Sequence, residues 1–185
     1  ENAKSAPTPI TKTRTKQELE EETKLDEGDT YKYRKCVGLL RYIQRFRGDL
    51  NFVCKELSHG VKTPHSGDML RLKRVGRYIK GTMNMARWFP CEGKVERILG
   101  YVDSDWAGDK ATRKSTSSLV VTVGDCVLYD AAKSQDPVGL SSGEAEWYAA
   151  VAGTSASLHI AEVVNFIFGT TLPLRMLTDS TVCKA

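Results

Sequence analysis

At 185 residues, with 41% hydrophobic and 27% charged residues, the chain is long enough to bury a core and has the composition of a folded globular protein. No stretch approaches the ~18 apolar residues of a membrane span, and the N-terminal residues lack a signal-peptide layout, so we expect no membrane partner. The five cysteines are scattered, without a Cys-x-x-Cys pair. This argues against a zinc site or a disulfide framework and favours a reducing, intracellular location, nuclear or cytoplasmic.

The net charge of +4 conceals a division along the chain. Residues 1–30 carry a net charge of −3, residues 31–95 carry +11, and residues 96–185 carry −4. Lysines and arginines on a single helix usually serve solubility, but this excess is larger than solubility requires. The pattern predicts a basic segment that holds a polyanion, followed by an acidic part that holds cations.

Residues 1–30 are polar and have no regular apolar pattern, so we interpret them as a tail or linker. Within them, residues 15–24 could form a short acidic helix, which would be marginal alone because it has no apolar face.

Residues 31–84 are predicted to form a small basic helical segment. Apolar residues recur at helical spacing over 31–46, 50–58 and 66–80, and Gly81 follows as a stop signal. Basic side chains surround the apolar stripe of the third helix, and these are candidate nucleic-acid-binding residues: Arg71, Lys73, Arg74, Arg77 and Lys80.

Residues 85–185 are predicted to form a second domain, with a sheet and a long helix. Strand-like runs occupy 85–89, 96–103, 117–123, 126–131 and 172–177. A long helix is expected between the last two of these runs, with Ser142 as its N-cap and its end near Phe168. The fold class is therefore α/β (α+β), a mixed sheet with flanking helices. Counted from the strand at 96–103, the order is β-β-β-α-β, in which the first and fourth strands, ending near Asp103 and Asp179, can be neighbours.

Two carboxylates stand at the end of the first long strand of the sheet. Asp103 follows apolar residues and Asp105 follows at i+2, so both side chains would lie on one face of a strand. Such a pair is mutually repulsive unless a cation lies between the carboxylates. The ordinary alternative is a polar turn leaving the strand.

A third carboxylate is expected from the long helix. Glu146 shares one helical face with Ala149, Ala150 and Gly153, and this run of small residues indicates close packing against a sheet. Glu144 lies about 200° away around the helix, so only one of the two glutamates can face the sheet. The small residues favour Glu146.

Together, Asp103, Glu146 and Asp179 predict one acidic cleft. Each alone could be a turn residue, a solvated helix position or an N-cap. Three carboxylates in one cleft repel each other without cations and suit one or two Mg²⁺ ions, with Mn²⁺ as the alternative. Two such ions can activate water against a phosphodiester.

At this point the sequence resembles a known family, the copia-type retrotransposon polyproteins. The motifs similar to their ribonuclease H region are 101–109 (YVDSDWAGD), 113–117 (RKSTS), 140–149 (LSSGEAEWYA) and 177–180 (LTDS). The motifs similar to the connection segment before it are 33–42 (YRKCVGLLRY) and 73–82 (KRVGRYIKGT). The resemblance covers about residues 31–185 and keeps the family's order and spacing.

The resemblance implies hydrolysis of the RNA strand of RNA–DNA hybrids by two-metal catalysis. It places the catalytic, metal-binding carboxylates on Asp103, Glu146 and Asp179, with Asp105 as a further candidate ligand. The basic helices, with Arg113 and Lys114, are then expected to bind the hybrid or RNA.

The chain departs from the family pattern in two respects. It ends before the last strand and helix, where a fourth acidic residue is expected, and it has no polymerase Tyr-x-Asp-Asp motif. The alternative is therefore a non-catalytic remnant that binds nucleic acid or serves as a structural part of a polyprotein or larger assembly.

Overall fold

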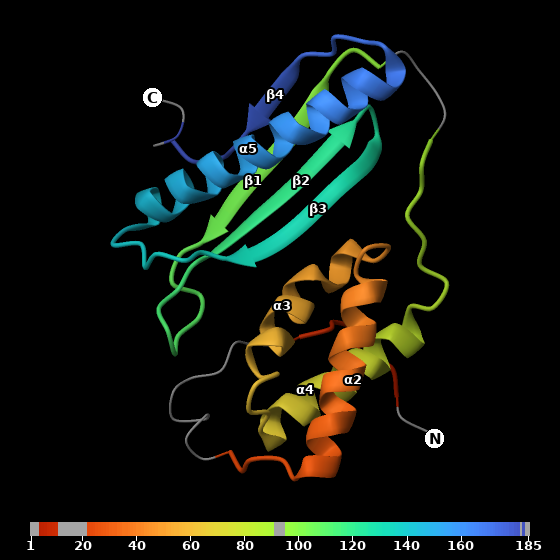
Figure 1. The fold of residues 1–185 in the computed structure, drawn as a ribbon, viewed down its shortest axis with the longest axis vertical. Coiled ribbons are helices and arrows are strands. Elements are labelled where there is room, and N and C mark those ends of the chain that lie inside the picture. Colours follow the sequence, from red (N-terminus) through yellow and green to blue (C-terminus); the bar gives the residue numbers. More distant parts are fainter. Residues whose placement is uncertain (1–3, 11–21, 91–94, 182, 184–185) are drawn as a thin grey trace. The chain divides into compact units, whose positions relative to one another are not determined.

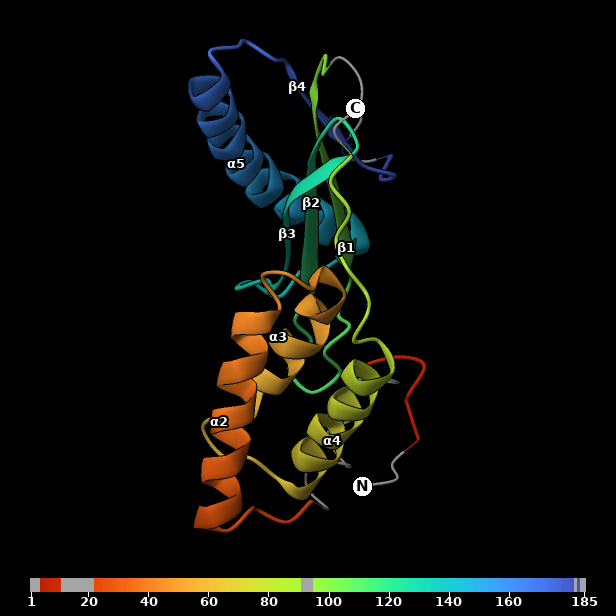
Figure 2. The ribbon, with the colours of Figure 1, turned by 90° about the vertical axis from the view of Figure 1, so that its right-hand side faces the viewer.

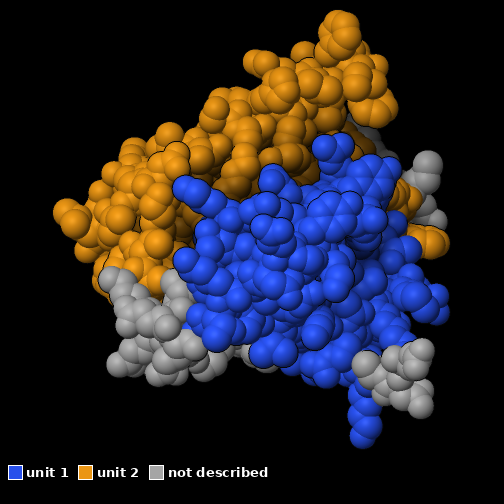
Figure 3. Space-filling view, turned by 60° about the horizontal axis from the view of Figure 1, so that its bottom comes forward, with its two compact units in different colours: residues 1–87 blue, residues 88–185 orange. Residues whose placement is uncertain are grey.

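The computed structural model describes residues 4–10, 22–90, 95–181 and 183. The chain divides into two compact units, Glu1–Arg87 and Trp88–Ala185 (Figure 3). Each unit has its own hydrophobic core and is described by itself.

The first unit is helical, with α2 (Glu27–Ile43), the 3₁₀ helix η1 (Gly48–Leu50), α3 (Asn51–His59) and α4 (Ser66–Gly81) (Figure 1). Helix α2 starts earlier than the apolar pattern predicts, because the Asp26 side chain accepts a hydrogen bond from the Asp29 amide at 2.7 Å and caps the helix. Tyr33 is fully buried, and its hydroxyl donates to the Leu57 carbonyl at 2.6 Å. This bond ties α2 to α3.

Part of the predicted polar tail belongs to this unit. Ala6 is buried in the helical core, and its amide donates to the Arg77 carbonyl at 3.4 Å. Residues 22–24 of the expected acidic helix are not helical, and the rest of that helix lies outside the described residues.

The second unit is built on a four-stranded sheet of β1 (Ile98–Asp105), β2 (Thr116–Val123), β3 (Cys126–Ser134) and β4 (Leu174–Leu177). The order is β3-β2-β1-β4, with β1 antiparallel to β2, β2 antiparallel to β3, and β4 parallel to β1 (Figures 1 and 2). The predicted α/β class with a mixed sheet is confirmed.

Helix α5 (Ser142–Phe168) crosses one face of this sheet (Figures 1 and 2). Its buried positions recur almost every fourth residue: Ala145, Ala149, Gly153, Ser157, Ala161 and Val164. A Cβ at Gly153 would overlap the Val102 side chain, so the helix approaches β1 as closely as a backbone allows. Gly169, in the left-handed conformation, ends the helix.

By length and composition alone, α5 could also cross a membrane. A helix that packs on a sheet can pass the same test, and the small residues of α5 face β1 and β2.

The predicted strand at 85–89 was wrong. These residues form no strand, and Trp88 remains 80% exposed. Aromatic composition suits a strand only where a neighbouring strand supplies the pairing and packing.

Candidate metal centre

The structure brings the three carboxylates of the predicted acidic cleft together. One carboxylate oxygen each of Asp103, Glu146 and Asp179 lies within 4.8 Å of the others. Asp103 is near the end of β1, Glu146 is in the first turns of α5, and Asp179 follows β4. Each side chain therefore comes from a different element of one packed unit.

The parallel pairing of β1 and β4 explains why two of these residues meet. Tyr101 pairs with Leu177, the last residue of β4. Asp103 and Asp179 each follow two residues after that pair. Their carboxylates therefore reach the same end of the sheet.

The first turn of α5 explains why the third carboxylate is Glu146. The predicted N-cap Ser142 was wrong by one residue: Ser141 caps the helix, because its hydroxyl accepts from the Glu144 amide at 3.1 Å. The Glu144 carboxylate accepts from the Leu140 amide at 2.7 Å and the Tyr148 hydroxyl at 2.9 Å. Glu144 thus belongs to the helix cap, and Glu146 faces β1.

The surroundings of Glu146 favour its neutral form. Partial burial raises the pKa of Glu146 above its ordinary value, the nearby Ser104 opposes this, and the charges of Asp103 and Asp179 add to the rise in pKa. Asp103 is held in place by the Ser104 amide, which donates to its Oδ1 at 2.8 Å.

This donor set fits a hard divalent cation. Carboxylate oxygens are the ligands that Mg²⁺ and Mn²⁺ prefer. Burial is the main cause of the raised pKa of Glu146, and a cation would relieve the further repulsion from Asp103 and Asp179. Asp103 and Asp179 are exposed, so solvent and a substrate can reach the cluster.

Asp105 is not part of this cluster of three. Its carboxylate lies over Gly108, where a Cβ would overlap it. Strand alternation alone predicts the same face for Asp103 and Asp105, but Asp105 is the last residue of β1 and the chain turns there.

The basic candidates of α4 differ in their surroundings. Lys73, Arg77 and Lys80 are exposed. The Arg74 guanidinium instead donates to the Thr8 carbonyl at 3.1 Å and the Thr8 hydroxyl at 3.0 Å. Arg71 is half-buried.

Arg113 and Lys114 lie in the loop between β1 and β2. The Asp109 carboxylate shapes this loop by accepting from the Ala111 amide at 3.0 Å and the Thr112 hydroxyl at 2.6 Å. Arg113 is exposed and has a φ of 62°, a conformation that costs energy in a residue with a Cβ. The loop presents Arg113 at the end of β1 that also bears Asp103.

The sequence analysis did not single out two residues that bond to the beginning of α5 or to the loop before it. Trp106 donates through Nε1 to the Gly139 carbonyl at 3.0 Å, and Gln135 donates to the Ala145 carbonyl at 2.8 Å. Both hold the beginning of α5. Neither carries a signal in sequence periodicity, because each contact joins segments far apart in the chain.

Comparison with known proteins relates most of the chain to retrotransposons. Over 130 residues it is 35% identical to the retrovirus-related Pol polyprotein from transposon RE1 of Arabidopsis thaliana, which covers 70% of the chain and 9% of that polyprotein. Over 156 residues it is 36% identical to that from transposon RE2 of the same plant, which covers 84% of the chain and 10% of the polyprotein. The chain is thus similar to a segment of retrotransposon Pol polyproteins.

The chain spans about a tenth of the length of those polyproteins. It also matches most of another protein, the secreted RxLR effector protein 161 of Plasmopara viticola, at 36% identity over 119 residues, covering 63% of the chain and 82% of that protein. No family model and no solved structure matches the chain.

Proposed function

We propose that this chain is a segment of a copia-type retrotransposon polyprotein. It would comprise a connection segment and a ribonuclease H-like domain that hydrolyses the RNA strand of RNA–DNA hybrids. The observation that carries the proposal is the meeting of Asp103, Glu146 and Asp179 within 4.8 Å. The relationship to retrotransposon Pol polyproteins supports it, because an element that copies RNA into DNA must remove the RNA template.

Three carboxylates of the chain would hold the metal ions that act on a phosphodiester. Asp103, held by the Ser104 amide, and Asp179 offer exposed oxygens, while Glu146 offers a half-buried one from α5. When bound there, Mg²⁺ or Mn²⁺ ions supply the activation of a water molecule and the stabilisation of the leaving oxygen. The exposed side of the cluster admits the phosphate backbone.

Basic side chains are proposed to hold the hybrid. Lys73, Arg77 and Lys80 of α4 are exposed, and Arg113 is presented by the loop after β1. Their charges would neutralise phosphates without reading sequence, so binding should be tolerant of sequence and sensitive to salt.

The test is cleavage of an end-labelled RNA–DNA hybrid with Mg²⁺ or Mn²⁺, with the variant Asp103→Asn beside the wild type. We expect metal-dependent cutting of the RNA strand that falls at least ~100-fold in the variant, because the cluster loses one charged ligand. A matched control is Asp105→Asn, whose carboxylate lies outside the cluster and should leave the rate within about threefold.

Equal cutting by wild type and Asp103→Asn would overturn the proposed site. Cutting that persists in EDTA would overturn the role of the metal.

A second candidate is a non-catalytic remnant that binds nucleic acid or serves as a structural part of an assembly. The observation that favours it is the match to 82% of the secreted RxLR effector protein 161, because related sequence makes up most of that protein. Binding of the hybrid without metal-dependent cutting, at every metal concentration tried, would select this candidate.

A further inference from the structure

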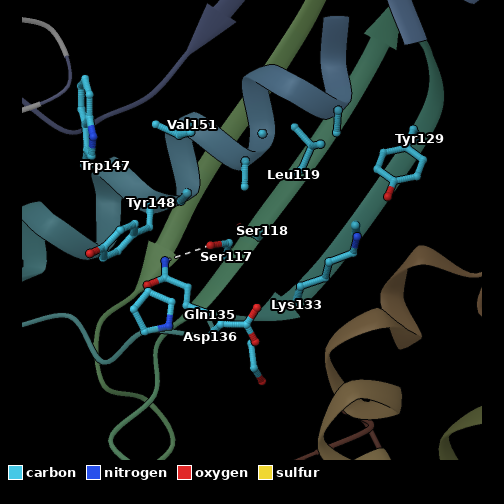
Figure 4. A pocket seen from close by; sticks show the side chains of 17 residues that line it. Ser117, Ser118, Leu119, Tyr129, Lys133, Gln135, Asp136, Trp147, Tyr148 and Val151 are labelled. Atoms are coloured by element: carbon cyan, nitrogen blue, oxygen red, sulfur yellow. Dashed lines mark hydrogen bonds between the residues drawn. The ribbon is translucent and has the colours of Figure 1, made fainter. Parts of the chain in front are cut away.

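Gln135 links three elements at the start of α5. It follows directly after β3, it is only 7% exposed, and its backbone amide donates to the Ser115 carbonyl at 2.8 Å. Its side-chain nitrogen Nε2 donates to the Ser117 hydroxyl of β2 at 2.9 Å and to the Ala145 carbonyl of α5 at 2.8 Å. Figure 4 shows the first of these side-chain bonds at the edge of a hollow of about 520 Å³.

The orientation of this amide is determined by its partners. A backbone carbonyl only accepts hydrogen bonds, so the group that faces Ala145 must be the NH₂ and not the oxygen. The Oε1 atom of Gln135 is then buried with no hydrogen-bond partner among the residues that the structure describes. An unpaired buried oxygen costs free energy, which offsets part of the stability that the two bonds from Nε2 contribute.

The bond to Ala145 acts on the peptide group that carries Glu146. The Ala145 carbonyl and the Glu146 amide belong to one planar unit, and Ala145 itself is fully buried. The Trp106 bond to Gly139 at 3.0 Å holds the loop just before the same helix. The start of α5 is thus attached to the ends of both β3 and β1.

We propose that Gln135 is a positioning residue for the carboxylate cluster. By fixing the Ala145–Glu146 peptide, it sets the rotation and height of the first turns of α5, and so the place where the Glu146 carboxylate meets those of Asp103 and Asp179. This inference rests on the proposed function for its consequence in catalysis. The anchoring of the first turn of α5 rests only on the observed hydrogen bonds of Gln135.

The experiment measures Mn²⁺ affinity and amide hydrogen exchange in the full chain, for the wild type and Gln135→Met. Methionine keeps the length and apolar stem but cannot donate to Ala145. We expect Mn²⁺ affinity to fall about tenfold, as for losses of groups that orient metal ligands. We expect faster exchange in the first turn of α5 with unchanged protection in β1 and β2, whereas a general loss of stability would lower protection everywhere.

The matched control is Ser117→Ala, which removes the other bond of the same Nε2 and leaves the bond to Ala145. It should keep Mn²⁺ affinity within about twofold. Gln135→Met that binds Mn²⁺ like the wild type, with an unchanged first turn, overturns the proposal.

Two further outcomes are decisive. If Gln135→Met fails to fold, exchange in the wild type decides: the proposal requires the Glu146 amide to be as protected as the sheet, and free exchange overturns it. A wild type that binds no Mn²⁺ overturns the proposed function, while the exchange data still decide the role of Gln135.

Discussion

Glu146 is the residue on which burial and neighbouring charge act together. Partial burial raises its pKa, Ser104 lowers it, and Asp103 and Asp179 raise it further. The folded state therefore binds the Glu146 proton more tightly than the unfolded state does. The contribution of the Glu146 carboxyl to stability is fully present below its pKa in the unfolded chain, about 4.3. This contribution is lost as the pH rises through the higher pKa that Glu146 has in the folded protein.

Replacing Glu146 by Gln should accordingly stabilise the metal-free protein at neutral pH. We expect the melting temperature of the variant to exceed that of the wild type by about 1–3 °C at pH 8 in EDTA, and to match it near pH 4. Thermal unfolding followed by tryptophan fluorescence reports on the second unit, because Trp88, Trp106 and Trp147 all lie there.

Added Mg²⁺ gives the matching control for this prediction. It should raise the melting temperature of the wild type and not that of Glu146→Gln, because only the wild type keeps the full set of carboxylates. A variant that is less stable than the wild type in EDTA at pH 8 would contradict the argument from the pKa.

At the scale of elements, the close approach of α5 to the sheet positions the cluster. The buried residues of α5 are small, and Gly153 leaves no space for a side chain against Val102 of β1. Glu146 lies two turns before Gly153, so the depth at which the helix packs also sets the distance from Glu146 to β1.

Gly153→Ala should therefore destabilise the second unit although alanine favours helices. We expect a loss of about 1–3 kcal/mol in the free energy of unfolding, because the added methyl group forces α5 away from β1. Urea unfolding monitored by tryptophan fluorescence measures it.

The matched control is Gly76→Ala in α4, where no atom lies within 4 Å of the added Cβ. That change should stabilise the helical unit by up to ~1 kcal/mol, seen by circular dichroism. If Gly153→Ala behaved like Gly76→Ala, close packing of α5 would not be what limits the position of Glu146.

At the scale of the whole molecule, positive charge is concentrated in one part of the chain, and the carboxylate cluster lies in the other. The segment 31–95 carries a net charge of +11, and the segment 96–185, with the carboxylate cluster, carries −4. Under the proposed function, the basic segment binds phosphate groups and the carboxylate cluster binds cations.

The double variant Lys73→Gln, Arg77→Gln should weaken binding of an RNA–DNA hybrid and flatten its salt dependence. Each lost phosphate contact lowers the slope of log affinity against log salt by ~1, so two contacts lower it by ~2. Fluorescence anisotropy over a salt series measures both quantities.

Lys32→Gln is the control for this pair, since Lys32 is already bonded to Asp29 at 2.8 Å and should change the slope little. An unchanged slope in the double variant would remove α4 from the nucleic-acid interface.

Much of the arrangement could be predicted from the sequence, because it depends on local pattern. Residue alternation and helical periodicity predict most of the elements, and the run of small residues distinguishes Glu146 from Glu144. The order of strands and helix then predicts that Asp103 and Asp179 meet, which the pairing of β1 with β4 bears out.

Only the tertiary structure decided which side chains are engaged by distant parts of the chain. Thr8 accepts hydrogen bonds from Arg74, and the Asp105 carboxylate lies over Gly108. Residues 85–89, expected as a strand, form none. Gln135 reaches Ala145 across the space between sheet and helix. The physical reason is that local sequence determines which face a side chain is on, whereas its contacts depend on packing between elements that no short-range pattern records.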